Sequence, residues 1–197
     1  MTRKVNLNAD MAEGFGAYDI GNDTALLDIV TSANVACGFH AGDPNVMDRV
    51  CKLAKEKGVS VGAHPGFNDL WGFGRRAMSM PAGDVERMVI YQIGALQAIA
   101  AANGMKVTHL KTHGALGNMA AVDADLAMAV ARAMKAVDPS LIFLVPTGSE
   151  LLNAARKAGL SYASEVFADR TYTDEGDLTP RRLPNAMVHD PAEAVER

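Results

Sequence analysis

Residues 32–65, SANVACGFHAGDPNVMDRVCKLAKEKGVSVGAHP, contain one complete strand–helix–strand unit and decide the fold. The β-rich runs SANVACGFH and VSVGAHP flank a segment of helical period near residues 45–57. Pro44 stands in the first turn of that helix, directly after Asp43, and Gly58 falls where a helix-ending glycine is expected. Two short strands joined in this way favour a parallel pair with a helical crossover.

The same alternation runs along the whole chain. Before this unit lie VNLNAD and a helix near residues 22–30; after it lie a helix near 82–103, HLKTHG, a helix near 123–136, LIFLVP, a helix near 148–158 and YASEVFAD. Repeated strand–helix units predict an α/β fold with a parallel sheet. Because no linker of Pro, Gly and Ser interrupts the pattern, we expect residues 1–197 to form a single domain.

The composition restricts the function classes. With 197 residues, of which 49% are hydrophobic and 21% charged, the chain can bury one good core. A net charge of -4 offers no basic footprint for a phosphate backbone, so we expect a small-molecule substrate and no nucleic acid. No leader and no apolar run of roughly 18 residues is evident, which predicts a cytoplasmic protein without a membrane span.

Four of the predicted strands carry polar side chains on one face and end in an ionisable group. The polar sets are Asn6, Asn8 and Asp10; Asn34 and His40; Ser60 and His64; and His109, Lys111 and His113. A solvated antiparallel sheet would show the same alternation, but helical crossovers leave no face for solvent. The pattern therefore favours a parallel β/α barrel with a polar interior and a site at the carboxyl ends of its strands.

The first two strands are followed by acids and an imidazole. Asp10 and Glu13 lie in NADMAEGFG, and paired acids at a strand end can act as a general base, bind a metal or bind an ammonium group. The alternative is that both carboxylates are exposed to solvent and have no function, as is common for two acidic residues in a loop. His40 and Asp43 close the second strand; Asp43 has an equally good role as a helix N-cap, whereas His40 is harder to explain as packing.

The loop after the third strand, GAHPGFNDLWGFGRR, is rich in glycine and aromatic residues. His64 stands at its root, and Arg75 and Arg76 stand at its far end. Such a loop can close as a lid and bring a guanidinium to a carboxylate or phosphate. Because neither a Walker A nor a GxGxxG motif is present, nucleotide binding cannot be argued from a phosphate loop.

The fourth strand contributes HLKTHGALGN, in which Lys111 and His113 point the same way and Asn118 follows one turn later. On a helix, His109 and His113 would form an i, i+4 metal pair, but the β context and the lack of an HExxH acid argue against that arrangement. The last strand adds Glu165. Lysine, imidazole and carboxylate groups at the ends of at least four parallel strands are typical of a barrel active site.

Nine segments together resemble the motifs of one known family, the LamB/YcsF proteins. They are LNADMAEGFGAYD, TSANVACGFHAGDP, GAHPGFNDLWGFGRRAM, YQIGAL, KTHGALGN, DPSLIF, GSELL, EVFADRTY and PNAMVHD, spread over essentially the whole chain. The resemblance implies an irregular β/α barrel of the polysaccharide deacetylase type. It also implies the activity of the A component of 5-oxoprolinase, which is ATP-dependent opening of the 5-oxoproline lactam to glutamate together with subunits B and C.

The resemblance also carries candidate roles onto matching residues. The catalytic candidates are Asp10, Glu13, His40, His64, Lys111 and His113, and the substrate-binding candidates are Asn8, Asp43, Arg75, Arg76, Asn118, Glu165 and Arg170. In this hypothesis Asp10 and His113 activate water. Lys111 and His64 stabilise the developing anion, and one of the two neighbouring arginines holds a carboxylate or phosphate.

Two rival hypotheses remain at this point. A metal-dependent deacetylase or related hydrolase would use Asp10, His64 and His113 as a one-carboxylate, two-histidine cation site. A non-catalytic regulatory subunit that binds a small molecule would have the same pocket without turnover of its own. The subunit that binds ATP, the need for a divalent metal and the formation of a homo-oligomer are left open.

The chain departs from the family pattern in four places. Ala12 stands where the family generally has Gly, Thr112 where it often has Pro, and Gly117 where it often has Tyr. The closing segment PAEAVER reads as the start of a helix, whereas family members continue for another strand and helix. We therefore expect a C-terminally truncated barrel that lacks its last strand and helix.

Overall fold

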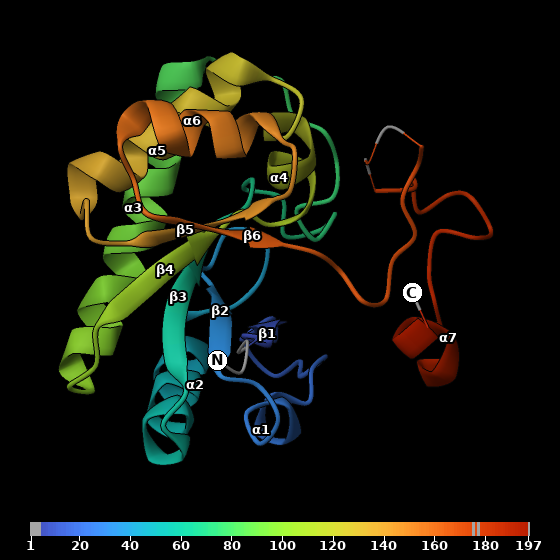
Figure 1. Ribbon diagram of the computed structural model, residues 1–197. Coiled ribbons are helices and arrows are strands. Elements are labelled where there is room, and N and C mark those ends of the chain that lie inside the picture. The colour runs from blue at the N-terminus through green and yellow to red at the C-terminus, as the bar shows by residue number, and fades with distance from the viewer. Residues whose placement is uncertain (1–4, 175, 177, 197) are drawn as a thin grey trace, which may run out of the picture.

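The computed structural model describes residues 5–174, 176 and 178–196, and a six-stranded parallel sheet lies at its centre (Figure 1). The strands are β1 (Asn8–Met11), β2 (Ser32–Ala36), β3 (Ser60–His64), β4 (Val107–Lys111), β5 (Ile142–Pro146) and β6 (Tyr162–Glu165). They lie in chain order, and each pairs in parallel with its neighbours in sequence. The sheet forms half of a β/α barrel, which confirms the predicted architecture.

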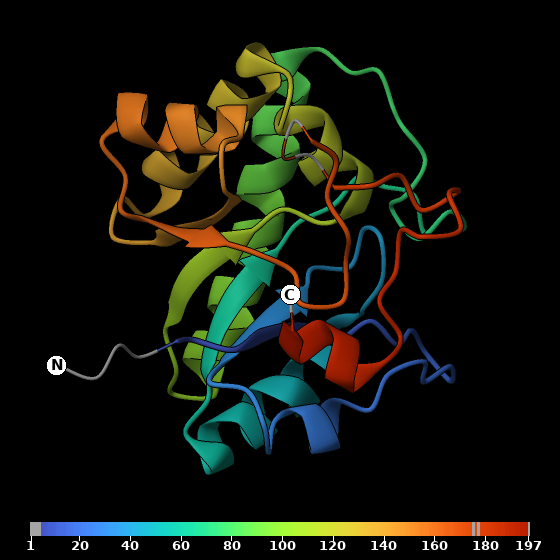
Figure 2. The same ribbon diagram turned by 45° about the vertical axis from the view of Figure 1, so that its right-hand side comes forward.

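Helices follow the strands (Figures 1 and 2). They are α1 (Asp23–Leu26), α2 (Pro44–Lys57), α3 (Ala82–Ala102), α4 (Gly114–Ala120), α5 (Ala124–Val137), α6 (Glu150–Ala158) and α7 (Pro191–Glu196). Helices α2, α3 and α6 pack against the sheet, and α5 packs against α3 and α6. One buried apolar row crosses the sheet, formed by Val35, Ala63, Leu110 and Phe143. Within the described residues, no helix has the length and apolar character needed to cross a bilayer.

Helix α2 begins and ends as its sequence predicts. The Asp43 carboxylate accepts hydrogen bonds from the backbone N–H groups of Asn45 and Val46, so it caps the helix that starts at Pro44. At the other end Gly58 adopts a φ of 69° and terminates the helix in the left-handed conformation. These two ends set the lengths of the loops that lead out of β2 and into β3.

Several predicted boundaries were wrong. The first strand was expected from Val5, but β1 begins at Asn8, and the side chains of Val5 and Leu7 are exposed. Helix α1 covers a single turn of the expected range 22–30. Helix α4 was not predicted, because its two glycines mask the helical pattern of a seven-residue segment.

The chain after β6 leaves the sheet. It runs as a long irregular segment to α7, the helix start predicted from PAEAVER (Figure 1). Short antiparallel bridges within the segment join Arg170 to Met187 and Tyr172 to Leu178. Among the described residues β1 and β6 each have one strand partner, so the barrel is open between them.

The inner face of the sheet contains a side-chain bridge over β3. Asn34, Gly62 and His109 occupy one row across β2, β3 and β4. The His109 Nε2 atom reaches over Gly62 to the Asn34 Oδ1 atom at 3.0 Å. A Cβ atom on Gly62 would overlap the imidazole ring of His109. The absence of a side chain at this residue therefore permits the buried polar bridge.

Replacement of Gly62 by alanine should lower the free energy of unfolding by about 2 kcal/mol or more, since the methyl group must displace His109. The matched control is Gly94→Ala on α3, where an added Cβ meets no atom within 4 Å. That change should raise the free energy of unfolding by up to about 1 kcal/mol. Urea unfolding curves measure both effects; equal values for the two variants would contradict the bridge.

Candidate active site

The carboxylate of Asp10, at the end of β1, lies at the centre of the polar inner face. Its Oδ1 atom accepts from the Asn34 side-chain amide at 2.9 Å and from Lys111 Nζ at 3.1 Å. Its Oδ2 atom lies 3.3 Å from His64 Nε2. Burial alone would raise the pKa of Asp10, but His64 and Lys111 hold it well below its usual value. Asp10 is therefore a fixed negative charge and a weak base.

Lys111, the last residue of β4, lies between two carboxylates. Its Nζ atom is 3.1 Å from Asp10 on β1 and 3.0 Å from Glu165 at the end of β6. Burial would lower the pKa of Lys111, but these carboxylates raise it, so the ammonium group stays charged. The two strands that flank the open side of the barrel thus bind the same cation. The Oε2 atom of Glu165 is buried without a hydrogen-bond partner among the described residues and can accept one from a ligand.

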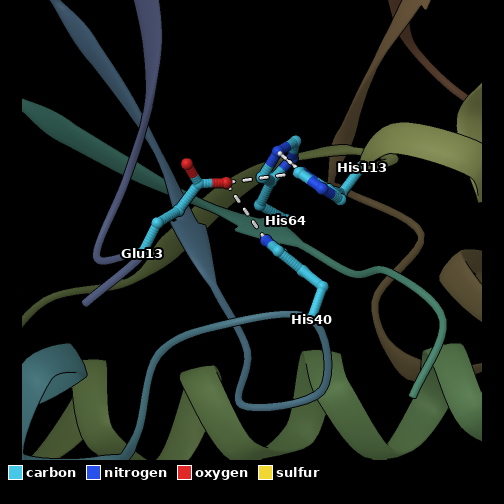
Figure 3. A group of neighbouring side chains, drawn as sticks. All are labelled: Glu13, His40, His64 and His113. Atoms are coloured by element: carbon cyan, nitrogen blue, oxygen red, sulfur yellow. Dashed lines mark hydrogen bonds and ion pairs between the residues drawn. The ribbon is translucent and has the colours of Figure 1, made fainter. Parts of the chain in front are cut away.

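Three imidazoles and one carboxylate form a second group, which we call the histidine cluster: Glu13, His40, His64 and His113 (Figure 3). One possible ligand atom from each residue lies within 4.8 Å of those from all the others. The His113 Nδ1 and His64 Nε2 atoms are 3.0 Å apart. The Glu13 Oε1 atom lies 3.2 Å from His40 Nε2 and 3.4 Å from His113 Nδ1.

Within the histidine cluster, the electrostatics favour the neutral forms of His40 and His113. Burial, followed by repulsion from His64, lowers the pKa of His40 to about 2 and that of His113 to about 3. Burial also raises the pKa of the Glu13 carboxyl above its usual value. Glu13 is consequently a better proton acceptor near neutral pH than Asp10, for which the sequence predicted that role.

The loop between β3 and α3 orients His113. The Asp69 carboxylate accepts hydrogen bonds from Gly72 N–H and from the guanidinium of Arg76, which folds the loop back on itself. Phe73 adopts a φ of 54°, unusual for a residue with a side chain. Its carbonyl oxygen accepts a hydrogen bond from His113 Nε2 at 2.8 Å. A strained backbone position therefore fixes the orientation of one imidazole.

Two further predicted residues lie beside these groups. The Asn8 Oδ1 atom accepts from the Asn34 side-chain amide at 2.7 Å, which ties β1 to β2 next to Asp10. The guanidinium of Arg75 lies 5.0 Å from the centre of the Phe73 ring. Burial, followed by repulsion from Arg181, lowers the pKa of Arg75, whereas Glu13 and Asp10 act in the opposite direction, which places the guanidinium at the edge of the site.

The remaining predicted residues have other surroundings. Asp43 caps α2 and also accepts from Gly16 N–H at 2.7 Å. Arg76 is engaged with Asp69, and Asn118 is exposed on α4. Arg170 donates to the carbonyl oxygens of residues 179 and 186 and holds the C-terminal segment together. The structure does not bring these four side chains into the histidine cluster.

Sequence reasoning did not assign Asn34, His109 or the Phe73 carbonyl to the site. Asn34 and His109 were noted only as members of polar strand faces, and their pairing depends on the register across Gly62. The metal set expected from sequence was Asp10, His64 and His113. The structure instead gathers Glu13 and His40 with the two imidazoles, and Asp10 faces His64 from the side of Lys111.

The fold and the site together define the class of this protein. It is an open parallel β/α barrel with a polar site at the carboxyl ends of its strands. Comparison with known proteins is more specific. The model of the LamB/YcsF family matches residues 5–197, and the chain belongs to this family. The predicted resemblance is thereby confirmed.

The relatives agree over nearly the whole chain. A protein of Rhodopseudomonas palustris (strain ATCC BAA-98 / CGA009), named as the A subunit of 5-oxoprolinase, is 56% identical, over 98% of this chain and 77% of that protein. A Gluconobacter oxydans (strain 621H) protein of the same name is 54% identical, over 100% of this chain and 78% of that one. The crystal structure of the lactam utilization protein from Thermus thermophilus matches with a TM-score of 0.95 and 47% identity, covering 99% of this chain and 79% of that chain.

The buried His109 should make stability depend on pH. Burial lowers its folded-state pKa to about 4, whereas an unfolded histidine has a pKa near 6.5. Acidification through this interval protonates the unfolded chain first and so favours unfolding. Between about pH 7 and about pH 5.5 the wild-type protein should lose about 1 kcal/mol more stability than His109→Gln. Urea unfolding at both pH values tests this; equal losses would show that His109 is not held neutral.

Proposed function

We propose that this chain is the ring-opening A subunit of an ATP-dependent 5-oxoprolinase, which converts 5-oxo-L-proline to L-glutamate in the cytoplasm together with subunits B and C. The observation that carries the proposal is that relatives 53–56% identical over at least 97% of the chain are named as the A subunit of 5-oxoprolinase. The site geometry is consistent with a small, polar, cyclic amide substrate.

The inner face offers one partner for each polar group of 5-oxoproline. Arg75, at the edge of the site, can pair with the substrate carboxylate. The unpartnered Oε2 atom of Glu165 can accept a hydrogen bond from the lactam N–H. The ammonium group of Lys111, only 3.0 Å from Glu165, lies where it can stabilise charge on the neighbouring lactam oxygen.

The chemistry requires activation, because an unstrained lactam is a poor electrophile. In the proposed reaction the lactam oxygen takes the γ-phosphoryl group of ATP and releases ADP. Water then adds to the activated carbon and gives a proton to Glu13, the stronger base of the two acids. The ring C–N bond breaks, the nitrogen takes up a proton to become the amine of glutamate, and the former lactam carbon is left as an acyl phosphate. A second water molecule hydrolyses this acyl phosphate, which releases phosphate and leaves the side-chain carboxylate of glutamate.

A metal-dependent hydrolase with another amide substrate is the second candidate function, and the histidine cluster is the observation that favours it. Such an enzyme would release product without ATP. A non-catalytic binding subunit would bind 5-oxoproline alone and would leave the turnover of its partners unchanged when Lys111 is replaced. ATP dependence and the effect of that replacement therefore separate the three functions.

The decisive assay measures glutamate released from 5-oxoproline by this chain alone, and then with B and C subunits, with and without ATP. Release that requires ATP and all three subunits supports the proposal. ATP-independent release would favour the second candidate. Absence of release from a complex whose three subunits co-purify would refute the proposal.

Replacement of Lys111 by methionine should abolish glutamate release, since it removes the charge that faces the lactam oxygen. It also takes the ammonium partner from both Asp10 and Glu165, at a cost of about 3–5 kcal/mol in stability. Lys52→Met is the matched control, because Lys52 is an exposed lysine on α2 paired with Asp48. Its turnover and melting temperature should remain close to wild type. Turnover by a folded Lys111→Met complex would remove Lys111 from the mechanism.

A further inference from the structure

Two backbone carbonyls fix the proton positions in the histidine cluster. The His64 Nδ1 atom lies 2.8 Å from the carbonyl oxygen of Lys111, and the His113 Nε2 atom lies 2.8 Å from that of Phe73. A carbonyl oxygen can only accept a hydrogen bond, so both of these ring nitrogens must carry the proton. When both rings are neutral, the opposite nitrogens, His64 Nε2 and His113 Nδ1, present lone pairs to each other.

The space between these nitrogens is bordered by hydrogen-bond acceptors. The two lone-pair nitrogens are 3.0 Å apart. The Glu13 Oε1 atom lies 3.4 Å from His113 Nδ1, and the Asp10 Oδ2 atom lies 3.3 Å from His64 Nε2. Both imidazoles are buried, which strengthens the mutual repulsion of the acceptors. Either a second proton on one ring or a metal ion among the four atoms would relieve this repulsion.

The separations match those between neighbouring ligands of one metal ion. With metal–nitrogen bonds of about 2.1 Å, adjacent ligand atoms lie about 3.0 Å apart in an octahedral site and about 3.4 Å apart in a tetrahedral one. The His113 Nδ1 atom lies 3.0 Å from His64 Nε2 and 3.4 Å from Glu13 Oε1, and the ligand atoms of all three residues lie within 4.8 Å of one another. The two imidazole planes are inclined by 86°, so both rings can direct a lone pair at one point. The carbonyl on the far side of each ring is the usual support of a ligating histidine.

His40 contributes differently. Its ring stacks on that of His113 with a centroid separation of 3.6 Å and an interplanar angle of 6°. Parallel rings cannot both place the same cation in their planes, so His40 must turn before it can coordinate. Among the described residues its Nδ1 atom has no hydrogen-bond partner, so the contact that the rotation must change is the one between its Nε2 atom and Glu13 Oε1, at 3.2 Å. His40 is therefore a fourth ligand that joins after the other three.

We propose that Glu13, His64 and His113 form a binding site for one divalent transition-metal ion, with His40 as a fourth ligand. Two imidazoles and one carboxylate suit Zn²⁺, Co²⁺ or Fe²⁺ and do not suit Mg²⁺, which prefers oxygen ligands. A bound cation would lower the pKa of a water molecule in the site, which would ease the loss of the proton that Glu13 accepts in the proposed reaction. The site goes beyond the proposed function, because its binding depends neither on the substrate nor on ATP.

Isothermal titration of the chelator-treated chain with Zn²⁺, and separately with Co²⁺, tests the site. We expect one ion per chain, a visible Co²⁺ absorption band and a higher melting temperature, with no competition from millimolar Mg²⁺. His64→Gln and His113→Gln should each weaken Zn²⁺ binding by more than about 100-fold, since loss of a supporting hydrogen bond alone costs about 10–100-fold. His40→Gln should have a smaller effect.

Two further variants keep the result interpretable. Glu13→Gln keeps the shape of a partly exposed side chain, so the variant should fold. It should bind Zn²⁺ at least about tenfold more weakly, which is the lower end of the loss seen when a residue of a metal site is changed. His189→Gln removes an exposed histidine outside the histidine cluster and should bind as the wild type does. Absence of stoichiometric binding to folded wild-type chain, or equal binding by the wild type and Glu13→Gln, would overturn the proposal. Neither result depends on glutamate release, so the metal site and the proposed function can fail separately.

Discussion

The ammonium group of Lys111 is the charge on which the inner face depends, because it binds the first and last strands of an open barrel to one point. Strands β1 and β6 share no backbone hydrogen bonds in the described sheet, yet Asp10 and Glu165 at their ends both contact Lys111. Both carboxylates are needed, since with only one of them Lys111 would not connect the end of β1 to the end of β6. A buried ion pair of this kind adds little to the net free energy of folding, and its main effect is on the positions of the strand ends. It fixes the distance across the mouth in which the site lies.

Much of this site follows from one rule, which is that the carboxyl ends of parallel strands meet at one edge. Asp10, His64, Lys111 and Glu165 each lie within a residue of a strand end, so the rule predicts from the sequence alone that they lie together. The rule could not predict which of Arg75 and Arg76 lies at the site, because the two are adjacent in the sequence. The structure distinguishes them, since Arg76 pairs with Asp69. Nor could the rule find the bridge from His109 to Asn34, which depends on the register across a residue without a side chain.

Backbone groups were the least predictable part. The carbonyl of Phe73 decides which nitrogen of His113 faces the histidine cluster, and no side-chain pattern signals a carbonyl. Its position results from a loop folded around Asp69 and from a left-handed φ at a bulky residue. Strain of this kind persists only where surrounding contacts over-determine it. The hydrogen bond from Ala115 N–H to the Gly74 carbonyl, which joins the loop to the start of α4, is one such contact.

Asp10 joins the two halves of the site, since one of its oxygens faces Lys111 and the other faces His64. A charge added next to His64 must therefore change the interaction between Asp10 and Lys111. A cation among His64, His113 and Glu13 would attract the Asp10 carboxylate and weaken its hold on the Lys111 ammonium group. Lys111 would then be freer to turn toward a negative charge developing on a substrate. In the proposed mechanism the two groups would act in sequence, because a filled histidine cluster would prepare Lys111 to stabilise the charge that develops on the substrate.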